Sequence, residues 1–304
     1  MNDKHMDNLM ESVEKWLSDE IEIGRSEEEI IDKFDKTYFT ELSLGIIDVS
    51  AEMYCNNFES NARVIIENSE RGDEEFYRKF IDKWGKALRL SKIMYYMCKE
   101  ILQSYQRNQG NSFLMKSLSE IYIRGCQVYL EVITLVSAGL ADGAWARWRT
   151  LYELGVLSQF IAENGEEAGE KFYKHKDSKN YYDWARSLPC FEGYPEENYI
   201  TFNAIFNKCK HKNRHWKKTY ESASIAIHAC TEGTLRRFGN YKKVATGIGP
   251  EMYGIDTPAI YAAESIGIIS LNYLGEFKDL NSRIMLKLIH KWIDLLKDHY
   301  SRIQ

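Results

Sequence analysis

The stretch that decides the fold is "VITLVSAGLADGAWARWRTLYELGVLSQFIA", residues 132–162. Apolar residues recur every three to four positions on both sides of Gly139, which is typical of two helices. Gly139 is expected to end the first helix. Asp142 is expected to cap the second, because its carboxylate can accept from the free N–H groups of a first helical turn. Two helices joined by so short a loop form an antiparallel hairpin.

The rest of the chain continues this helical pattern. Only 4 prolines and 19 glycines occur in 304 residues, and there is no alternation of strand and helix patterns and no internal repeat. These features predict an all-α fold, a multi-helix bundle. We expect a polar helical extension over residues 1–40, in which Ser26 and Glu29 form a capping box, and a bundle domain over residues 41–304.

The later helices are predicted from the same periodicity. The pattern from residue 41 to 108 contains a break at 67–79. The second helix of the hairpin should stop at Asn164-Gly165. Further helices are expected at 166–188 and 198–218, at a start signal with Pro258 in the first turn, and over an amphipathic C-terminal segment, 281–300.

Charge and cysteine usage limit the class of protein. The net charge of -5 excludes a globally basic nucleic-acid binder but leaves room for a local basic patch. The six cysteines form no CxxC pair, so we expect reduced thiols in a cytoplasmic protein with no metal site and no cofactor. The charged N-terminal segment is not a signal peptide, and no run approaches the roughly 20 apolar residues that span a bilayer, so no membrane partner is expected.

Charged side chains in the central hairpin are the first candidate site. A helical wheel leaves the second helix with no purely polar face, so it should be buried nearly all round. Arg149 and Glu153 are four residues apart and can form an ion pair. His228 lies in another apolar helical segment and is the predicted third member. In a catalytic interpretation Arg149 binds a phosphate, His228 is the acid or base and Glu153 orients it; in a structural one the pair only joins helices.

Two further groups of side chains could bind anions. Arg147, Tyr173 and His175 are candidates for supporting or anion contacts. A basic segment follows at residues 208–218, and its cations and tryptophan could hold a phosphate backbone and stack on a base, or could simply form a solvated helix end. Its candidate residues are Lys208, Lys210, Lys212, Arg214, Trp216, Lys217 and Lys218. His211 and His215 lie four apart among lysines, and no metal is expected there.

The run Ala146–Glu153, the segment Tyr173–His175 and His228 resemble an uncharacterised bacterial family, the domain-of-unknown-function 5677 family, over residues 115–275. That resemblance implies a fold but no reaction. The chain also resembles, more loosely, the helical ribonucleases of the HEPN superfamily, which act in phage defence and toxin systems. Those enzymes place an Arg and a His on one helix, as Arg283 and His290 are placed here, although Ile284 replaces the usual polar residue. This resemblance implies metal-independent RNA cleavage by attack of the 2′-hydroxyl on the adjacent phosphate.

Three hypotheses stay open from the sequence. The first is a cytoplasmic effector that acts on nucleic acid, with RNA as its partner, through Arg149, Glu153 and His228. The second is a non-enzymatic interaction protein whose terminal helices dock a partner protein or a second copy of the chain. The third is a sensor that binds an anion or nucleotide at Arg149 in a pocket of the bundle.

Overall fold

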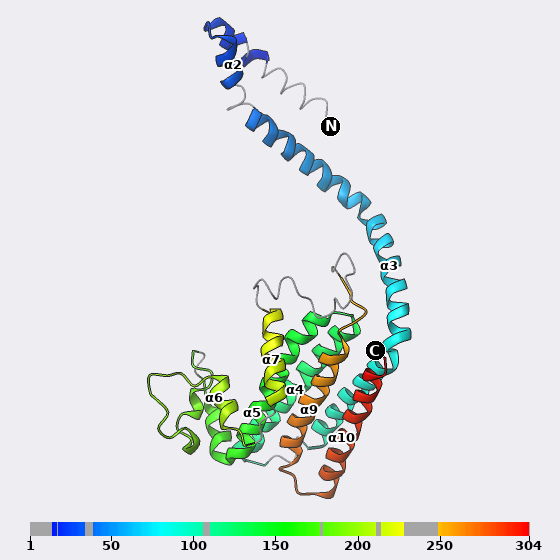
Figure 1. Ribbon diagram of the computed structural model, residues 1–304, viewed down its shortest axis with the longest axis vertical. Coiled ribbons are helices and arrows are strands. Elements are labelled where there is room, and N and C mark those ends of the chain that lie inside the picture. Colours follow the sequence, from blue (N-terminus) through cyan, green and yellow to red (C-terminus); the bar gives the residue numbers. More distant parts are fainter. Residues whose placement is uncertain are drawn as a thin grey trace. The chain divides into compact units, whose positions relative to one another are not determined.

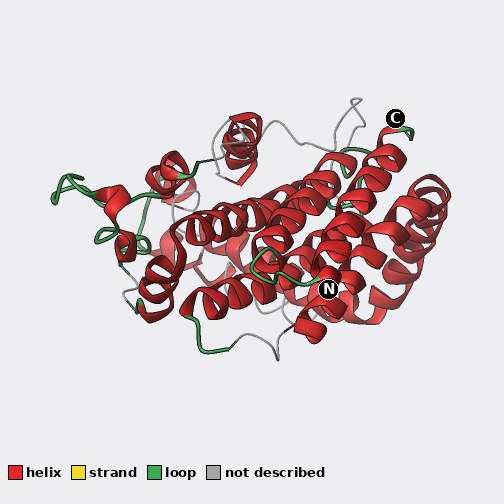
Figure 2. Cartoon of the chain, turned by 90° about the horizontal axis from the view of Figure 1, so that it is seen from below, coloured by secondary structure: helices red, strands yellow, loops and turns green. Residues whose placement is uncertain are grey.

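The protein is described by a computed structural model covering residues 14–16, 18–33, 39–105, 110–176, 179–210, 214–227 and 249–303 (Figure 1). Every regular element within these ranges is helical (Figure 2). The predicted all-α, multi-helix fold is therefore confirmed. Within the same ranges, no helix combines the length and apolarity that a membrane span requires.

The chain divides into two compact units, Met1–Tyr77 and Arg78–Gln304. The domain boundary predicted after residue 40 stays a prediction. Helix α3 (Phe39–Tyr105) contributes to both units and is continuous, so the predicted break at 67–79 is wrong. Gly72 lies inside this helix, and the charged residues around it are mostly good helix formers.

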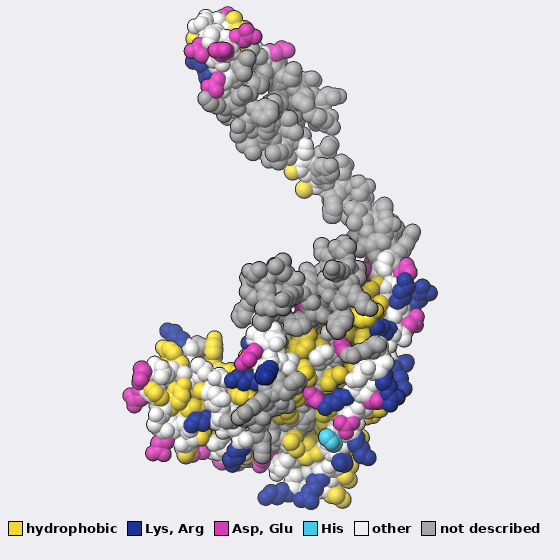
Figure 3. Space-filling model, in the orientation of Figure 1, with side chains coloured by type: hydrophobic (Ala, Val, Ile, Leu, Met, Phe, Trp, Pro, Cys, Tyr) yellow, Lys and Arg dark blue, Asp and Glu magenta, His cyan; other side chains and the backbone are white. Residues whose placement is uncertain are grey.

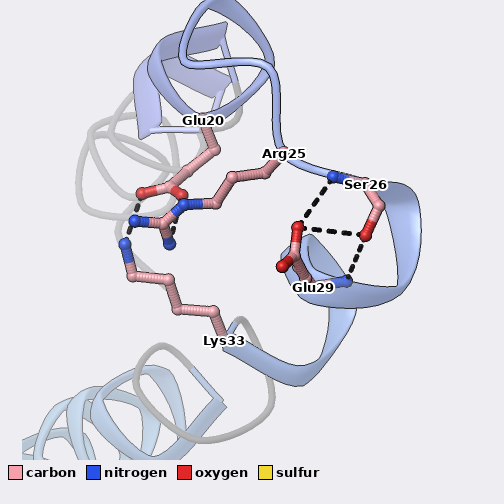
Figure 4. A network of polar contacts seen from close by, with 5 residues as sticks. All are labelled: Glu20, Arg25, Ser26, Glu29 and Lys33. Atoms are coloured by element: carbon pink, nitrogen blue, oxygen red, sulfur yellow. Dashed lines mark hydrogen bonds and ion pairs between the residues drawn. The ribbon is translucent and has the colours of Figure 1, made fainter.

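The first unit contains a polar network next to helix α2 (Glu27–Lys33) (Figure 4). The Ser26 hydroxyl accepts from the Glu29 N–H at 3.3 Å, and the Glu29 carboxylate accepts from the Ser26 N–H at 3.1 Å. The predicted capping box is therefore confirmed. Beside it, the buried carboxylate of Glu20 pairs with Arg25 at 2.8 Å and with Lys33 at 2.5 Å, which ties the two ends of this segment together.

The second unit is a bundle built on the predicted hairpin. Helices α4 (Phe113–Ser137) and α5 (Ala141–Lys174) form the hairpin, and α9 (Asp256–Leu274) packs on both (Figure 1). Helix α10 (Leu280–Ser301) packs on α9 and, through Trp292 Nε1 donating to the Leu90 carbonyl at 3.0 Å, on the second half of α3. The start of α9 with Pro258 in its first turn and the C-terminal helix are confirmed.

The hairpin turn follows the prediction at Gly139 but not at Asp142. Gly139 has φ +71°, a backbone conformation that favours glycine, and a Cβ there would lie 3.0 Å from the Glu251 carbonyl oxygen. Helix α5 begins at Ala141 after Leu140, so Asp142 lies inside the first turn and the prediction that it caps the helix is wrong. Its charge still suits the positive end of the helix dipole.

The stop predicted at Asn164-Gly165 is confirmed as an interruption of α5. Gly165 (φ 70°, ψ −151°) has a non-helical backbone, and a second helical stretch continues from this kink to Lys174. The kink carries Glu166 to the start of α4, where its carboxylate accepts from the Ser112 hydroxyl at 2.5 Å and from the Phe113 N–H at 2.7 Å. These contacts satisfy free donors of the first turn of α4 and lower the pKa of Glu166.

The segments after the kink are shorter than predicted. The helix expected at 166–188 ends at Lys174, and two short 3-10 turns, η3 (Asp183–Ala185) and η4 (Pro189–Phe191), follow. The helix expected at 198–218 is divided into α6 (Phe202–Lys208) and α7 (Arg214–Ile227). Just after α6 the Lys210 N–H donates to the Glu163 carboxylate at 2.7 Å. This backbone N–H therefore has a hydrogen-bond partner although Lys210 is not in a helix.

Candidate functional site

The predicted pair of Arg149 and Glu153 is present and is joined by Tyr220 of α7. Arg149 Nη2 lies 3.7 Å from Glu153 Oε1 and donates to the Tyr220 hydroxyl at 2.8 Å. The Tyr220 hydroxyl in turn donates to Glu153 Oε1 at 2.5 Å. The Arg149 guanidinium also lies 4.6 Å from the Tyr220 ring centroid, a cation–π distance. We call these three residues the Arg–Glu–Tyr cluster.

The Arg–Glu–Tyr cluster lies at the border between core and solvent. The prediction that its helix is buried nearly all round is confirmed only in part: no residue from 141 to 165 is exposed, but more than half of them are only half-buried. The side chains of Arg149 and Glu153 nevertheless keep 21% and 29% of their accessible surface. A solute can therefore reach the charges, while the surrounding protein strengthens their electrostatic interactions relative to water.

Aromatic rings form the apolar side of the cluster. The Tyr220 ring lies 5.1 Å from Tyr152 and 5.4 Å from Phe202, and Phe202 lies 6.3 Å from Tyr182. Burial and the hydrogen bond to Glu153 raise the pKa of Tyr220 to about 12. Burial and the charge of Glu153 raise the pKa of Tyr182 to about 12 as well. Both phenols are therefore protonated at neutral pH, and that of Tyr220 donates to Glu153.

Two polar atoms, one in the cluster and one beside it, are buried without a hydrogen-bond partner. They are Arg149 Nε and the Tyr152 hydroxyl oxygen. A buried donor without a partner is costly, and such atoms in a protein call for an explanation. Here one of these atoms belongs to Arg149 itself and the other to Tyr152, whose ring packs on Tyr220 of the cluster.

The remaining predicted anion contacts are placed elsewhere. Arg147 faces α4, where its Nε bonds the carboxylate of Glu131, and it does not join Arg149. Tyr173 is 48% exposed. His175 Nε2 lies 3.1 Å from the Asn180 carbonyl oxygen. His175 also lines an open pocket of about 640 Å³ at the end of α5, together with Lys171, Lys174, Asp183 and Arg186.

The basic segment 208–218 is only partly available for binding. The Lys208 and Lys217 ammonium groups lie 5.6 Å from the ring centroids of Phe191 and Phe206 respectively. Trp216 is 8% exposed and packs between Tyr152 and Tyr261 at 6.1 and 6.3 Å, so its ring is not free to stack on a base. Among the segment's other residues, Lys210 and Lys218 are exposed. Lys212 and the side chain of Arg214 lie outside the described residues.

His228 also lies outside the described residues, directly after the last residue of α7. The sequence prediction missed Tyr220. A signal for it exists: Trp216, Tyr220 and Ala223 are spaced by four and three positions, which places them on one face of a helix. That face packs on α5, with Trp216 and Ala223 buried. A polar aromatic residue on an otherwise apolar stripe needs a partner for its hydroxyl, and Glu153 supplies it.

Two further predictions concern metals and the C-terminal helix. In the described ranges, no cluster of three or more His, Cys, Asp or Glu residues is arranged to hold a metal ion. The five cysteines within those ranges are free thiols. Arg283 and His290 are both exposed on α10, and His290 lies 3.8 Å from Asp294.

Comparison with known proteins finds one similarity, which covers part of the chain. Residues 116–251 match the model of a family of unknown function, DUF5677. The match covers α4 without its first three residues, and all of α5, α6 and α7. It therefore includes the whole Arg–Glu–Tyr cluster, but less than half of the chain. It supports the predicted resemblance over this region. No curated protein and no solved structure matches the chain.

Proposed function

We propose that the protein acts on RNA and that the Arg–Glu–Tyr cluster binds the phosphate at which the reaction occurs. The observation that carries this proposal is the environment of Arg149: a partly exposed guanidinium, held by a tyrosine and a carboxylate, with its Nε buried and unpaired. A planar guanidinium that is partly exposed can donate to the oxygens of a phosphate.

The proposed reaction is metal-independent cleavage. The 2′-hydroxyl of the substrate attacks the adjacent phosphorus, and the bond to the 5′-oxygen of the next nucleotide breaks. His228 would take the proton of the attacking hydroxyl or return one to the leaving oxygen. Arg149 would stabilise the negative charge that develops on the phosphate, and Glu153 would hold its neighbours in position. We assign His228 this role from its position in the sequence. It follows α7 directly, and Tyr220 lies on that helix.

The test compares folded variants on a labelled RNA. We expect Arg149→Ala and His228→Ala to lose cleavage by about 100-fold or more, as is usual when a group that stabilises the transition state is removed. Arg147→Ala is the matched control, since it removes the same cation from the same helix but on the face that contacts Glu131. If Arg149→Ala cleaves and binds RNA as the parent does, the proposal is wrong.

A second function is favoured by one specific contact. Because Tyr220 bonds both charges, the cluster also ties α7 to α5. In a non-enzymatic interaction protein this link would be its whole role. Glu153→Gln would then lower the melting temperature, and neither the parent nor any variant would cleave RNA.

A further inference from the structure

The second half of α3 carries a row of positive charge within an acidic protein. Residues 78–99, "RKFIDKWGKALRLSKIMYYMCK", contain seven Lys and Arg residues and a single carboxylate, Asp82. The net charge of the whole chain is -5. A protein with a negative net charge can therefore still carry a local positive patch, and this segment is one.

The cations of this segment lie on its outer face. The opposite face is buried, with Phe80, Trp84 and Ala87 at most 1% exposed. Five of the cations are exposed and form no ion pair with any other described residue, and we call them the basic row. They are Arg78, Lys86, Arg89, Lys92 and Lys99.

The basic row is rigid and extended. At a rise of 1.5 Å per residue, the helix from Arg78 to Lys99 is about 32 Å long, which is enough to meet several successive phosphates. Its orientation is fixed by bonds to the rest of the bundle. The Tyr129 hydroxyl donates to the Ser91 carbonyl at 3.2 Å, and the Tyr122 hydroxyl donates to the Cys98 carbonyl at 3.0 Å. The cations are therefore presented without a large cost of ordering the backbone.

Helix α10 extends the positive surface. It packs beside α3 through Trp292 and carries three more exposed cations at four-residue intervals, Arg283, Lys287 and Lys291. None of the three forms an ion pair within the described residues. In Figure 3 the Lys and Arg side chains gather along this edge of the bundle, over α3 and α10.

We infer that the basic row binds the phosphate backbone of RNA, which places a second contact surface on α3 outside the Arg–Glu–Tyr cluster. Because the row carries several positive charges, its ligand should be a polyanion. Because the row is long, that polyanion should be extended. A lipid surface fits less well, because the apolar face that would enter a membrane is buried in the bundle. Tyr96, 50% exposed, adds a ring to the same helix on which a base could stack. The choice of RNA rests on the proposed function.

The experiment measures how RNA affinity depends on salt. The probe is a fluorescent single-stranded RNA of about 20 nucleotides, and the variant is Lys86→Gln/Arg89→Gln/Lys92→Gln. Losing three phosphate contacts should reduce the slope of log affinity against log salt by about 2, and affinity at low salt should fall by about 10-fold or more. The control variant, Lys171→Gln/Lys176→Gln/Lys278→Gln, removes three exposed cations that also lack ion pairs in the described structure. It should retain the parent slope.

The outcomes separate this inference from the proposed function. If the parent and the control bind RNA and the α3 variant binds with the same affinity and slope, the inference is wrong and the proposed function stands. If the parent binds no RNA, both are wrong. If the α3 variant loses binding to phosphatidylserine vesicles but retains RNA binding, the row serves a membrane and the inference is wrong. Unchanged melting temperatures for both triple variants would show that folding is not the cause.

Discussion

Tyr220→Phe is the substitution that probes the Arg–Glu–Tyr cluster most directly. It removes one oxygen and leaves the ring, so the contacts with Tyr152 and Phe202 and the cation–π contact with Arg149 are kept. Two charge-assisted hydrogen bonds are lost, to Glu153 and from Arg149. The effect on stability is therefore a measure of those bonds alone.

The expected loss of stability in Tyr220→Phe depends on how exposed Arg149 and Glu153 are. Hydrogen bonds to charged groups contribute roughly 1.5–3 kcal/mol. Arg149 and Glu153 keep 21% and 29% of their surface, so water replaces part of each lost bond. We expect the free energy of unfolding to fall by about 1–2 kcal/mol, which for a domain of this size lowers the melting temperature by about 3–6 °C.

The assay is a double-mutant cycle followed by urea denaturation. The cycle combines Tyr220→Phe with Glu153→Gln, and we expect a coupling energy of about 1 kcal/mol, because the two residues share one hydrogen bond. Tyr173→Phe is the control, since its side chain is 48% exposed, and it should change stability by less than about 0.5 kcal/mol. Additivity of the two cluster substitutions within about 0.3 kcal/mol would refute the geometry on which the cluster rests.

Three further predictions follow from the fold. Glu166→Gln should lower stability by about 0.5–1 kcal/mol at neutral pH, as for a lost helix cap. Because the pKa of Glu166 is lowered, this stabilisation is complete at pH values above the usual pKa of a glutamate and is lost as the pH falls through the lowered pKa. The stabilities of parent and variant should therefore become equal at acid pH. Gly169→Ala would place a Cβ 2.5 Å from the Leu114 Cα and should cost about 1–3 kcal/mol in chemical denaturation, whereas Gly143→Ala, whose nearest neighbour is a flexible side chain at 3.4 Å, should not destabilise. Because the pKa of Tyr220 is raised to about 12, its contribution is complete below the ordinary tyrosine pKa and is lost as the pH rises through about 12. The free energy of unfolding of Tyr220→Phe should therefore fall less steeply with rising pH in the alkaline range than that of the parent, and equal slopes would contradict this.

The helices themselves were largely predictable from the sequence. The hairpin around Gly139, the capping box at Ser26 and Glu29, and the start of α9 all depend on contacts between residues a few positions apart. Local patterns carry this information, because caps and turns are formed by neighbours in the chain. The predicted break at 67–79 was wrong because a single glycine costs only about 1 kcal/mol and most of the charged residues around it are good helix formers, so a long helix tolerates it.

The candidate site was predictable only in part. Arg149 and Glu153 are one helical turn apart, so their pairing follows from spacing alone. Tyr220 comes from a helix some seventy residues later, and no local pattern joins it to α5. The sequence also assigned Trp216 to an exposed basic face, whereas the structure buries it against Tyr152.

The sequence by itself determined that this chain is helical and where its charges can pair within a turn. The tertiary structure decided which helices meet and which charges face water. It brought Tyr220 to Glu153, turned Arg147 toward Glu131 and away from Arg149, and left the cations of α3 on an open face. The physical reason is that periodicity records the buried stripe of each helix, whereas a site depends on which stripes pack together, and packing is a property of side-chain shape across the whole core.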